Sequence, residues 1–389
     1  DNGQLIGSAT AGSDGAWRFT PATPLAEGAH SITATATDPA GNEGPSSTPL
    51  AFSVDTVAPA APVLAIAEAS GGVNAVEAAD GVQTQISLPA GTMAGDILTL
   101  SVNGPSGSHS VRYTVSPNDL VANSATVTIP VADLGANGQF ADGSYTVTAT
   151  VTDSAGNTSV ASAPASFVLD TAAPAAPLLQ AATDDANPVT GPIADGGATN
   201  DTTPTFSGTA EPGSTVKVYD NGQLIGSATA GSDGAWRFTP SPALAEGAHS
   251  IAVTATDPAG NEGPSSTPLD FTVDTTAPAA PTVNSQVTND TTPVLTGTAE
   301  AGSTVRVTVG DATFQVVADS HGLWSLDTGA VTPVSGSFAL GADGLKNVYL
   351  TSTDAAGNRS IGSGSITLNT AAPDAPTLSA SDDVGSVQG

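Results

Sequence analysis

The sequence of 389 residues contains no cysteine, so no disulfide can form and no thiolate is available for catalysis or metal binding. Basic residues are scarce: seven Lys and Arg stand against 37 Asp and Glu, for a formal net charge of −30. This surface would repel nucleic acid and anionic membranes and would attract cations. No apolar run approaches the roughly 18 residues of a membrane-spanning helix, so we expect no membrane insertion.

Aromatic residues make up only 4% of the chain, whereas Gly and Pro number 43 and 29. Helix-forming Lys, Glu, Arg and Met are few, which argues against long helices. An acidic chain rich in Gly, Ser and Thr is also compatible with disorder. Alternation of apolar and polar residues argues against disorder and predicts β-strands at 31–37, 144–151 and 304–309.

The chain repeats itself: residues 1–62 recur with a handful of changes at 220–281, an offset of 219 residues. Four related Pro-containing segments, at 55–62, 170–177, 274–281 and 369–376, set the period. Their first residues are 115, 104 and 95 residues apart, each the size of a small β domain. We therefore predict three complete repeats joined by short, stiff linkers and flanked by two fragments. These are repeat one (1–55), repeat two (56–170), repeat three (171–274), repeat four (275–369) and the start of a further repeat (370–389).

Within repeat three, seven short strands separated by turns predict an immunoglobulin-like β-sandwich. They are strand A after Pro177, B at 204–210, C at 215–219, D at 224–228, E at 236–238, F at 249–256 and G at 269–273, with a long polar connection at 184–203. Trp236 on strand E, like Trp17 and Trp324, is expected to anchor the core. Repeat two has no Trp and is interpreted as a sister type. The predicted fold class is all-β, a tandem array of such sandwiches.

Acidic residues recur in turns that a sandwich of this topology gathers at the end receiving the preceding domain. The F–G turn keeps Asp-x-Ala-Gly-Asn, the B–C turn carries an acid, and the incoming linker begins with Asp. Carboxylates that converge repel one another unless a cation lies between them, and Ca²⁺ takes six to eight oxygen ligands. The predicted Ca²⁺ ligands at the joints are Asp55, Asp96, Asp153, Asn157, Asp170, Glu211, Asp257, Asn261, Asp274, Glu300, Asp354 and Asn358. The alternative is that Asp-x-Ala-Gly-Asn serves only as turn chemistry.

A second acidic group lies in the A–B connection at the opposite pole. It comprises Asp184, Asp185, Asp195 and Asp201 of repeat three, with counterparts Glu77 and Asp80 in repeat two and Asp290 in repeat four. These residues are candidates for another ion within a domain, and solvated loop acids are the equal alternative. No EF-hand loop or Gly-Gly-x-Gly-x-Asp repeat is present, so any calcium site must be assembled from separate turns.

No catalytic motif of the Gly-x-Ser-x-Gly or His-Glu-x-x-His type occurs. Four histidines, His30, His109, His249 and His321, are scattered, and His30 and His249 occupy one position of two copies. We therefore predict that the protein is not an enzyme and that this repeated histidine is structural.

A set of motifs resembles the bacterial Ig-like repeats of giant Bap-like and Lap-like surface adhesins, which are exported by type I secretion. The set is NDTTP at 200–204, GTAEPGSTV at 208–216, DGAW at 233–236, ATDPAGN at 255–261 and VDTTAP at 273–278. The resemblance covers nearly the whole chain. It implies an extracellular stalk on the bacterial surface, rigidified by calcium, that supports biofilm formation or attachment. The partners are then neighbouring repeats of the same chain, and ligand-binding modules lie outside this segment.

Two other functions stay open. The repeats could form an array that binds glycans or proteins through their loops, although few aromatic residues are available for this. They could also associate between cells. For residues 1–55, which lack strands A, B and most of C, we expect poor order or completion by another molecule, because half a sandwich exposes its core and its edges.

Overall fold

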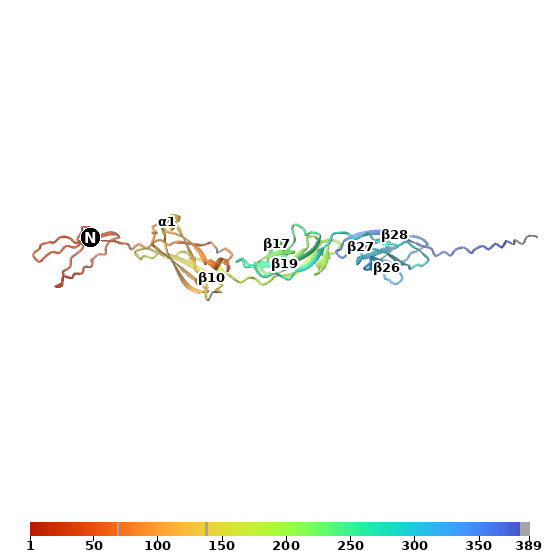
Figure 1. Ribbon diagram of the computed structural model, residues 1–389, viewed down its shortest axis with the longest axis horizontal. Coiled ribbons are helices and arrows are strands. Elements are labelled where there is room, and N and C mark those ends of the chain that lie inside the picture. The colour runs from red at the N-terminus through yellow and green to blue at the C-terminus, as the bar shows by residue number, and fades with distance from the viewer. Residues whose placement is uncertain (68–69, 137–138, 382–389) are drawn as a thin grey trace, which may run out of the picture. The chain divides into compact units, whose positions relative to one another are not determined.

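The computed structural model describes residues 1–67, 70–136 and 139–381 (Figure 1). The chain divides into two compact units, residues 1–173 with 258–261, and residues 174–257 with 262–389. Within them, repeats two, three and four each fold into two facing β-sheets, which confirms the predicted all-β architecture of Ig-like sandwiches. No helix among the described residues is long and apolar enough to span a membrane.

Repeat three consists of two sheets, β13-β12-β15-β18 and β14-β20-β19-β16-β17. The strands are β12 (Leu178–Asp184), β13 (Gly191–Ile193), β14 (Gly197–Thr199), β15 (Thr205–Thr209), β16 (Thr215–Asp220), β17 (Gln223–Thr229), β18 (Ala235–Phe238), β19 (Gly247–Thr256) and β20 (Leu269–Val273). Alternate residues face inward, so Val216 and Val218 are fully buried while Thr215 is exposed. Trp236, Phe206 and Phe271 belong to the same core, as the sequence predicted for the tryptophan.

The polar connection at 184–203 differs from the expectation of a long loop. It contains β13, which pairs with β12, and β14, which pairs in parallel with β20 through Gly197 and Phe271. The main-chain groups of these two short strands are therefore paired with the sheets, and the connection is attached to both of them.

Repeat two has the sheets β3-β4-β7 and β11-β10-β5-β6, with a small hairpin β8-β9. Its elements are β3 (Val63–Ile66), η2 (Glu77–Asp80), β4 (Val82–Ser87), β5 (Ile97–Gly104), β6 (Gly107–Thr114), α1 (Pro117–Ala122), β7 (Ser124–Ile129), η3 (Val131–Asp133), β8 (Gly135–Ala136), β9 (Gln139–Phe140), β10 (Gly143–Thr152) and β11 (Ala165–Leu169). Tyr145 stacks on Phe167 at a centroid distance of 5.0 Å. This pair fills the core that lacks tryptophan.

Repeat four has the sheets β21-β23-β26 and β22-β28-β27-β24-β25. Its strands are β21 (Thr282–Val283), β22 (Val287–Thr288), β23 (Val294–Thr298), β24 (Thr304–Val309), β25 (Ala312–Val317), β26 (Leu323–Asp327), β27 (Gly344–Thr353) and β28 (Arg359–Leu368). Trp324 is buried and donates its indole N–H to the main-chain oxygen of Thr282 at 3.0 Å. This bond joins β26 to β21, the two outer strands of one sheet.

Residues 1–55 form only the strand pair β1 (Gly28–Ile32) and β2 (Leu50–Val54). Trp17 is 56% exposed, whereas its copy Trp236 is 2% exposed. The core position of the complete repeat is thus open to solvent in this segment. Residues 382–389 of the predicted further repeat lie outside the described residues.

Candidate functional site at the joints between repeats

The F–G turns of repeats one, two and four are each closed by an aspartate of the turn. In repeat two, Oδ1 of Asp153 accepts hydrogen bonds from the main-chain N–H groups of Ala155 and Asn157, both at 2.9 Å. Asn157 Nδ2 donates to the second carboxylate oxygen at 2.9 Å, and this bond, with the main-chain bonds, lowers the pKa of Asp153. The same bonds join Asp38 to Asn42 and Asp354 to Asn358. The aspartate therefore fixes the turn and orients the asparagine.

The oriented asparagine reaches the linker that precedes its repeat. Its Nδ2 donates to the main-chain oxygen of the first linker residue at 3.0 Å from Asn157 to Asp55, at 2.8 Å from Asn261 to Asp170 and at 2.7 Å from Asn358 to Asp274. One hydrogen bond thus recurs at all three joints. We call it the joint clasp.

A second contact accompanies the joint clasp at two joints, through the alanine of Asp-x-Ala-Gly-Asn. The oxygen of Ala259 accepts a hydrogen bond from Asn74 Nδ2 at 2.8 Å, and that of Ala356 accepts one from the main-chain N–H of Asn200 at 3.1 Å. Both donors lie in the A–B connection of the preceding repeat. The following glycine has a positive φ, 98° at Gly357, and a Cβ there would lie 3.1 Å from Val189. Glycine therefore allows both the turn and the close approach.

The linker is also fixed by the repeat that it leaves. The second residue of each linker is a threonine, and its hydroxyl donates to an acid in the connection between strands E and F of the preceding repeat (between β18 and β19 in repeat three). The pairs are Thr275 with Glu246 at 2.7 Å, Thr171 with Asp142 at 2.9 Å, Thr370 with Asp343 at 2.8 Å, and Thr56 with Glu27. The hydroxyl bonds lower the pKa of Glu246 and of Asp343. These acids are not among the residues predicted from the sequence, although a constant spacing of 29 residues between acid and threonine in three of the four cases could have revealed them.

The predicted metal ligands are only partly brought together. The F–G turn meets the linker at every joint, but through the asparagine Nδ2 and a main-chain oxygen. The linker carboxylates of Asp55, Asp170 and Asp274 each accept a main-chain N–H two residues on, as an Asx turn does. Of the B–C acids, Glu211 and Glu300 are exposed, whereas Asp96 is buried and accepts the N–H of Met93 at 2.8 Å.

These oxygen donors are of the kind that Ca²⁺ binds. Nowhere in the described ranges, however, do three or more Asp, Glu or His side chains form a group that could hold a metal ion.

The carboxylates of the second acidic group accept hydrogen bonds that hold the A–B connection in place. Asp184 and Asp201 are buried, and Thr199 links them: its hydroxyl donates to Asp184 at 2.6 Å and accepts the N–H of Asp201 at 3.0 Å. Asp201 also accepts the N–H of Asp185 at 3.2 Å, and Asp195 accepts that of Asp270 at 3.0 Å. Counterparts elsewhere do the same locally: Glu77 accepts the N–H of Asn74, Asp290 accepts that of Thr292, and Asp80 lies exposed at the end of η2.

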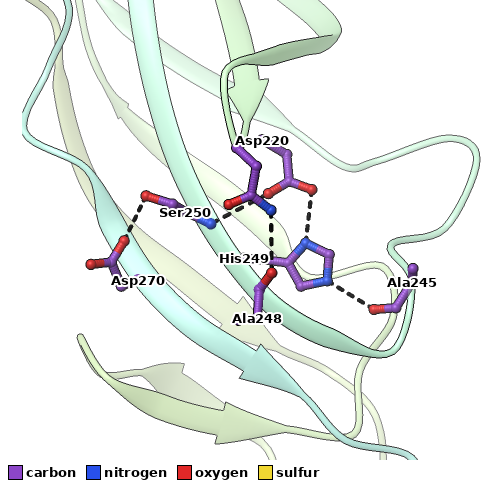
Figure 2. Close-up of polar contacts among 7 residues, drawn as sticks. Asp220, Ala245, Ala248, His249, Ser250 and Asp270 are labelled. Atoms are coloured by element: carbon purple, nitrogen blue, oxygen red, sulfur yellow. Dashed lines mark hydrogen bonds and ion pairs between the residues drawn. The ribbon is translucent and has the colours of Figure 1, made fainter.

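The repeated histidine holds the C–D hairpin against the E–F connection (Figure 2). His249 lies with Nδ1 2.8 Å from Oδ2 of Asp220 and Nε2 2.8 Å from the main-chain oxygen of Ala245. His30 has the same two contacts, with Asp1 and Ala26, at 2.7 Å each. Both ring nitrogens are thus engaged within the fold, as expected of a structural residue.

The fold and these contacts define a tandem array of Ig-like sandwiches with hydrogen-bonded linkers. The bacterial Ig-like domain family matches residues 1–56, 132–171, 178–275 and 281–370, and the chain belongs to this family. The first part of repeat two, residues 57–131, lies outside the match.

Several solved structures are similar to the chain, and none is similar enough to carry a function to it. A tetra-tandem repeat in the extending region of a large adhesion protein is 20% identical, with 93% of this chain and 88% of that chain covered and a TM-score of 0.34. A structure concerned with cell-surface retention of a 1.5-MDa bacterial ice-binding adhesin is 24% identical, covering 80% and 99%, with a TM-score of 0.31. The BSP domain of a biofilm associated protein is 16% identical, covering 82% and 69%, with a TM-score of 0.20. No curated protein matches.

Proposed function

We propose that the chain is a spacer segment of a bacterial cell-surface adhesin, which extends the protein from the cell and supports biofilm formation or attachment to a surface. The observation that carries this proposal is the joint clasp, which recurs with the same donor and acceptor at Asn157, Asn261 and Asn358. A domain that binds a ligand by itself has no need to fix the linker in front of it. A spacer does, because its reach depends on how freely each linker bends.

Several features support this role. Each linker is held on one side by an acid of its own repeat, such as Glu246, and on the other by the asparagine of the next repeat. Prolines follow directly and restrict the remaining backbone freedom. The absence of cysteine suits a protein that folds after export without an oxidation step. We accordingly propose an extracellular location and no enzymatic activity, with neighbouring repeats as the principal partners.

Calcium rigidification remains a prediction from the sequence. In this proposal the joint clasp and the threonine–acid bonds restrict each linker, and calcium would add to their effect. Any bound ion would stabilise the folded repeats, because binding to the folded form alone raises the free energy of unfolding.

Small-angle scattering of the full chain tests the spacer proposal. Replacing Asn157, Asn261 and Asn358 by Ala should give a broader distribution of interatomic distances than the unchanged chain, while circular dichroism shows that the sheets persist. An unchanged distribution would remove the argument for a spacer of restricted bending.

A further inference from the structure

The outer face of one sheet in repeat four carries an unusual pair of basic residues. Adjacent strands place Arg306 of β24 opposite Thr351 of β27, and Thr351 opposite Ile361 of β28. The next row along the sheet joins Thr304, Thr353 and Arg359 in the same way. Arg306 and Arg359 are both exposed and lie in neighbouring rows of this face. Together with Lys346, they are three of only seven basic residues in the chain.

The registers identify the same two positions in the other complete repeats. Repeat three has Lys217, opposite Thr254, and Glu262, bridged to Thr256. Repeat two has Thr99, opposite Thr150, and Thr158, bridged to Thr152. The two positions therefore hold two neutral residues in repeat two, an ion pair in repeat three and two basic residues in repeat four.

Repeat three shows that side chains at these positions can meet. Lys217 Nζ lies 2.7 Å from Glu262 Oε2, and Thr254 donates its hydroxyl to the same carboxylate at 2.7 Å. The hydrogen bond with Glu262 raises the pKa of Lys217, and the reciprocal bond lowers the pKa of Glu262. The face of repeat three thus neutralises its own charge.

Repeat four has no such neutralisation. Within the part of the chain that the structure describes, no ion pair includes Arg306 or Arg359. Two exposed cations repel each other only weakly in water, and an anion that lies between them is attracted to both. Tyr349 and Ile361 beside them are 59% and 78% exposed, and they line a shallow depression together with Thr351 and Ser363.

We propose that this face of repeat four, defined by Arg306, Arg359, Tyr349 and Ile361, binds an acidic saccharide. Planar guanidinium groups bind carboxylate or sulfate groups through two parallel hydrogen bonds. An exposed tyrosine ring and an isoleucine offer apolar surface for the face of a sugar ring, and Thr351 and Ser363 offer hydroxyls. The site goes beyond the spacer function and does not depend on it.

Charge favours a saccharide over a second copy of this chain. Another copy would bring a net charge of −30 to a chain of the same charge, and the two would repel each other. An oligosaccharide covers a much smaller surface, and its repulsion from acids more than about 10 Å away is screened at moderate salt.

The test is calorimetric titration of the full chain in EDTA with a uronate hexasaccharide, and with a neutral hexasaccharide as the matched ligand. EDTA excludes bridging of uronates by divalent ions. We expect the acidic ligand alone to bind, with an affinity that falls as salt rises. The variant R306T/R359T, which installs the pair of repeat two, and R306K/R359E, which installs that of repeat three, should each weaken binding about tenfold or more, the scale of one charge-assisted contact. Both should melt as the unchanged protein does.

Three outcomes would overturn the proposal: no binding of the acidic ligand, equal binding of the two ligands, or equal binding by the unchanged chain and by variants that keep its melting temperature. Sedimentation would also contradict it if the unchanged chain self-associated and both variants did not, because the face would then serve a second copy. E262R in repeat three provides the reciprocal variant and should add a second, weaker site.

Discussion

Asn358 Nδ2 lies 2.7 Å from the main-chain oxygen of Asp274 and 3.0 Å from Oδ2 of Asp354. One amide group therefore joins the linker that leaves repeat three to the turn that opens toward it from repeat four. The turn carboxylate accepts one amide hydrogen, and this positions the other toward the linker.

Removing this amide should loosen a joint without unfolding a repeat. We expect Asn358→Ala to cost about 1 kcal/mol, the usual net worth of such a hydrogen bond. Spin labels on either side of the linker should report a wider distance distribution. Asn42→Ala is the matched control, because within the described residues Asn42 Nδ2 binds only Asp38 of its own turn. If Asn358→Ala broadened the spin-label distances equally across a joint whose own asparagine is intact, the role of Asn358 in restricting its joint would be contradicted.

Acid should weaken the joints. The pKa values of Asp153, Glu246 and Asp343 are lowered in the folded protein. A carboxyl group with a lowered pKa adds stability above its unfolded value, about 4, and this contribution is lost as the pH falls through the folded value. The melting temperature should therefore decline below about pH 4. Glu246→Gln should reduce the pH dependence of protection at Thr275 in hydrogen exchange, and an unaltered profile would count against this role.

Trp17 and Trp236 occupy one position of two copies but should contribute very differently to the free energy of unfolding. Trp236→Ala should cost about 3–5 kcal/mol, because the side chain is buried in the core of repeat three. Trp17→Ala should change stability by less than about 0.5 kcal/mol, since Trp17 is largely exposed. Hydrogen exchange resolved by peptide can follow β19 and β1 separately in each variant. Similar losses at both sites would mean that residues 1–55 have a closed core.

Calcium can be tested directly. The sequence predicts that millimolar Ca²⁺ raises the melting temperature relative to chelator, and that Asp257→Ala removes most of this gain in repeat three. Asp38→Ala alters the same turn in repeat one and serves as the comparison. Identical melting with Ca²⁺ and with chelator would contradict calcium rigidification and leave the joint to the hydrogen bonds described above.

The strands of repeat three could be predicted because their side chains alternate between core and solvent, as at Thr215 to Val218. The strand β14 could not, since its three residues, Gly, Ala and Thr, are small and show no alternation, and its pairing with β20 depends on residues more than 70 positions away. Asn157, Asn261 and Asn358 recur in the sequence, and in the structure each bonds to the preceding linker, while their role as metal ligands stays a prediction. Sequence could not say that their amide nitrogen rather than their oxygen faces the linker, because that choice depends on a main-chain oxygen that the sequence does not place.

The acceptor of the joint clasp, in the linker before the repeat that carries the asparagine, is a main-chain oxygen, and every amino acid has one. A repeat that carries its own asparagine and its own E–F acid can follow almost any predecessor without matched changes in it. Gene segments that encode whole repeats could then be duplicated, lost or exchanged with little penalty. The near-identical stretches 1–62 and 220–281 belong to repeats one and three, with repeat two between them, and are the kind of record that such shuffling leaves.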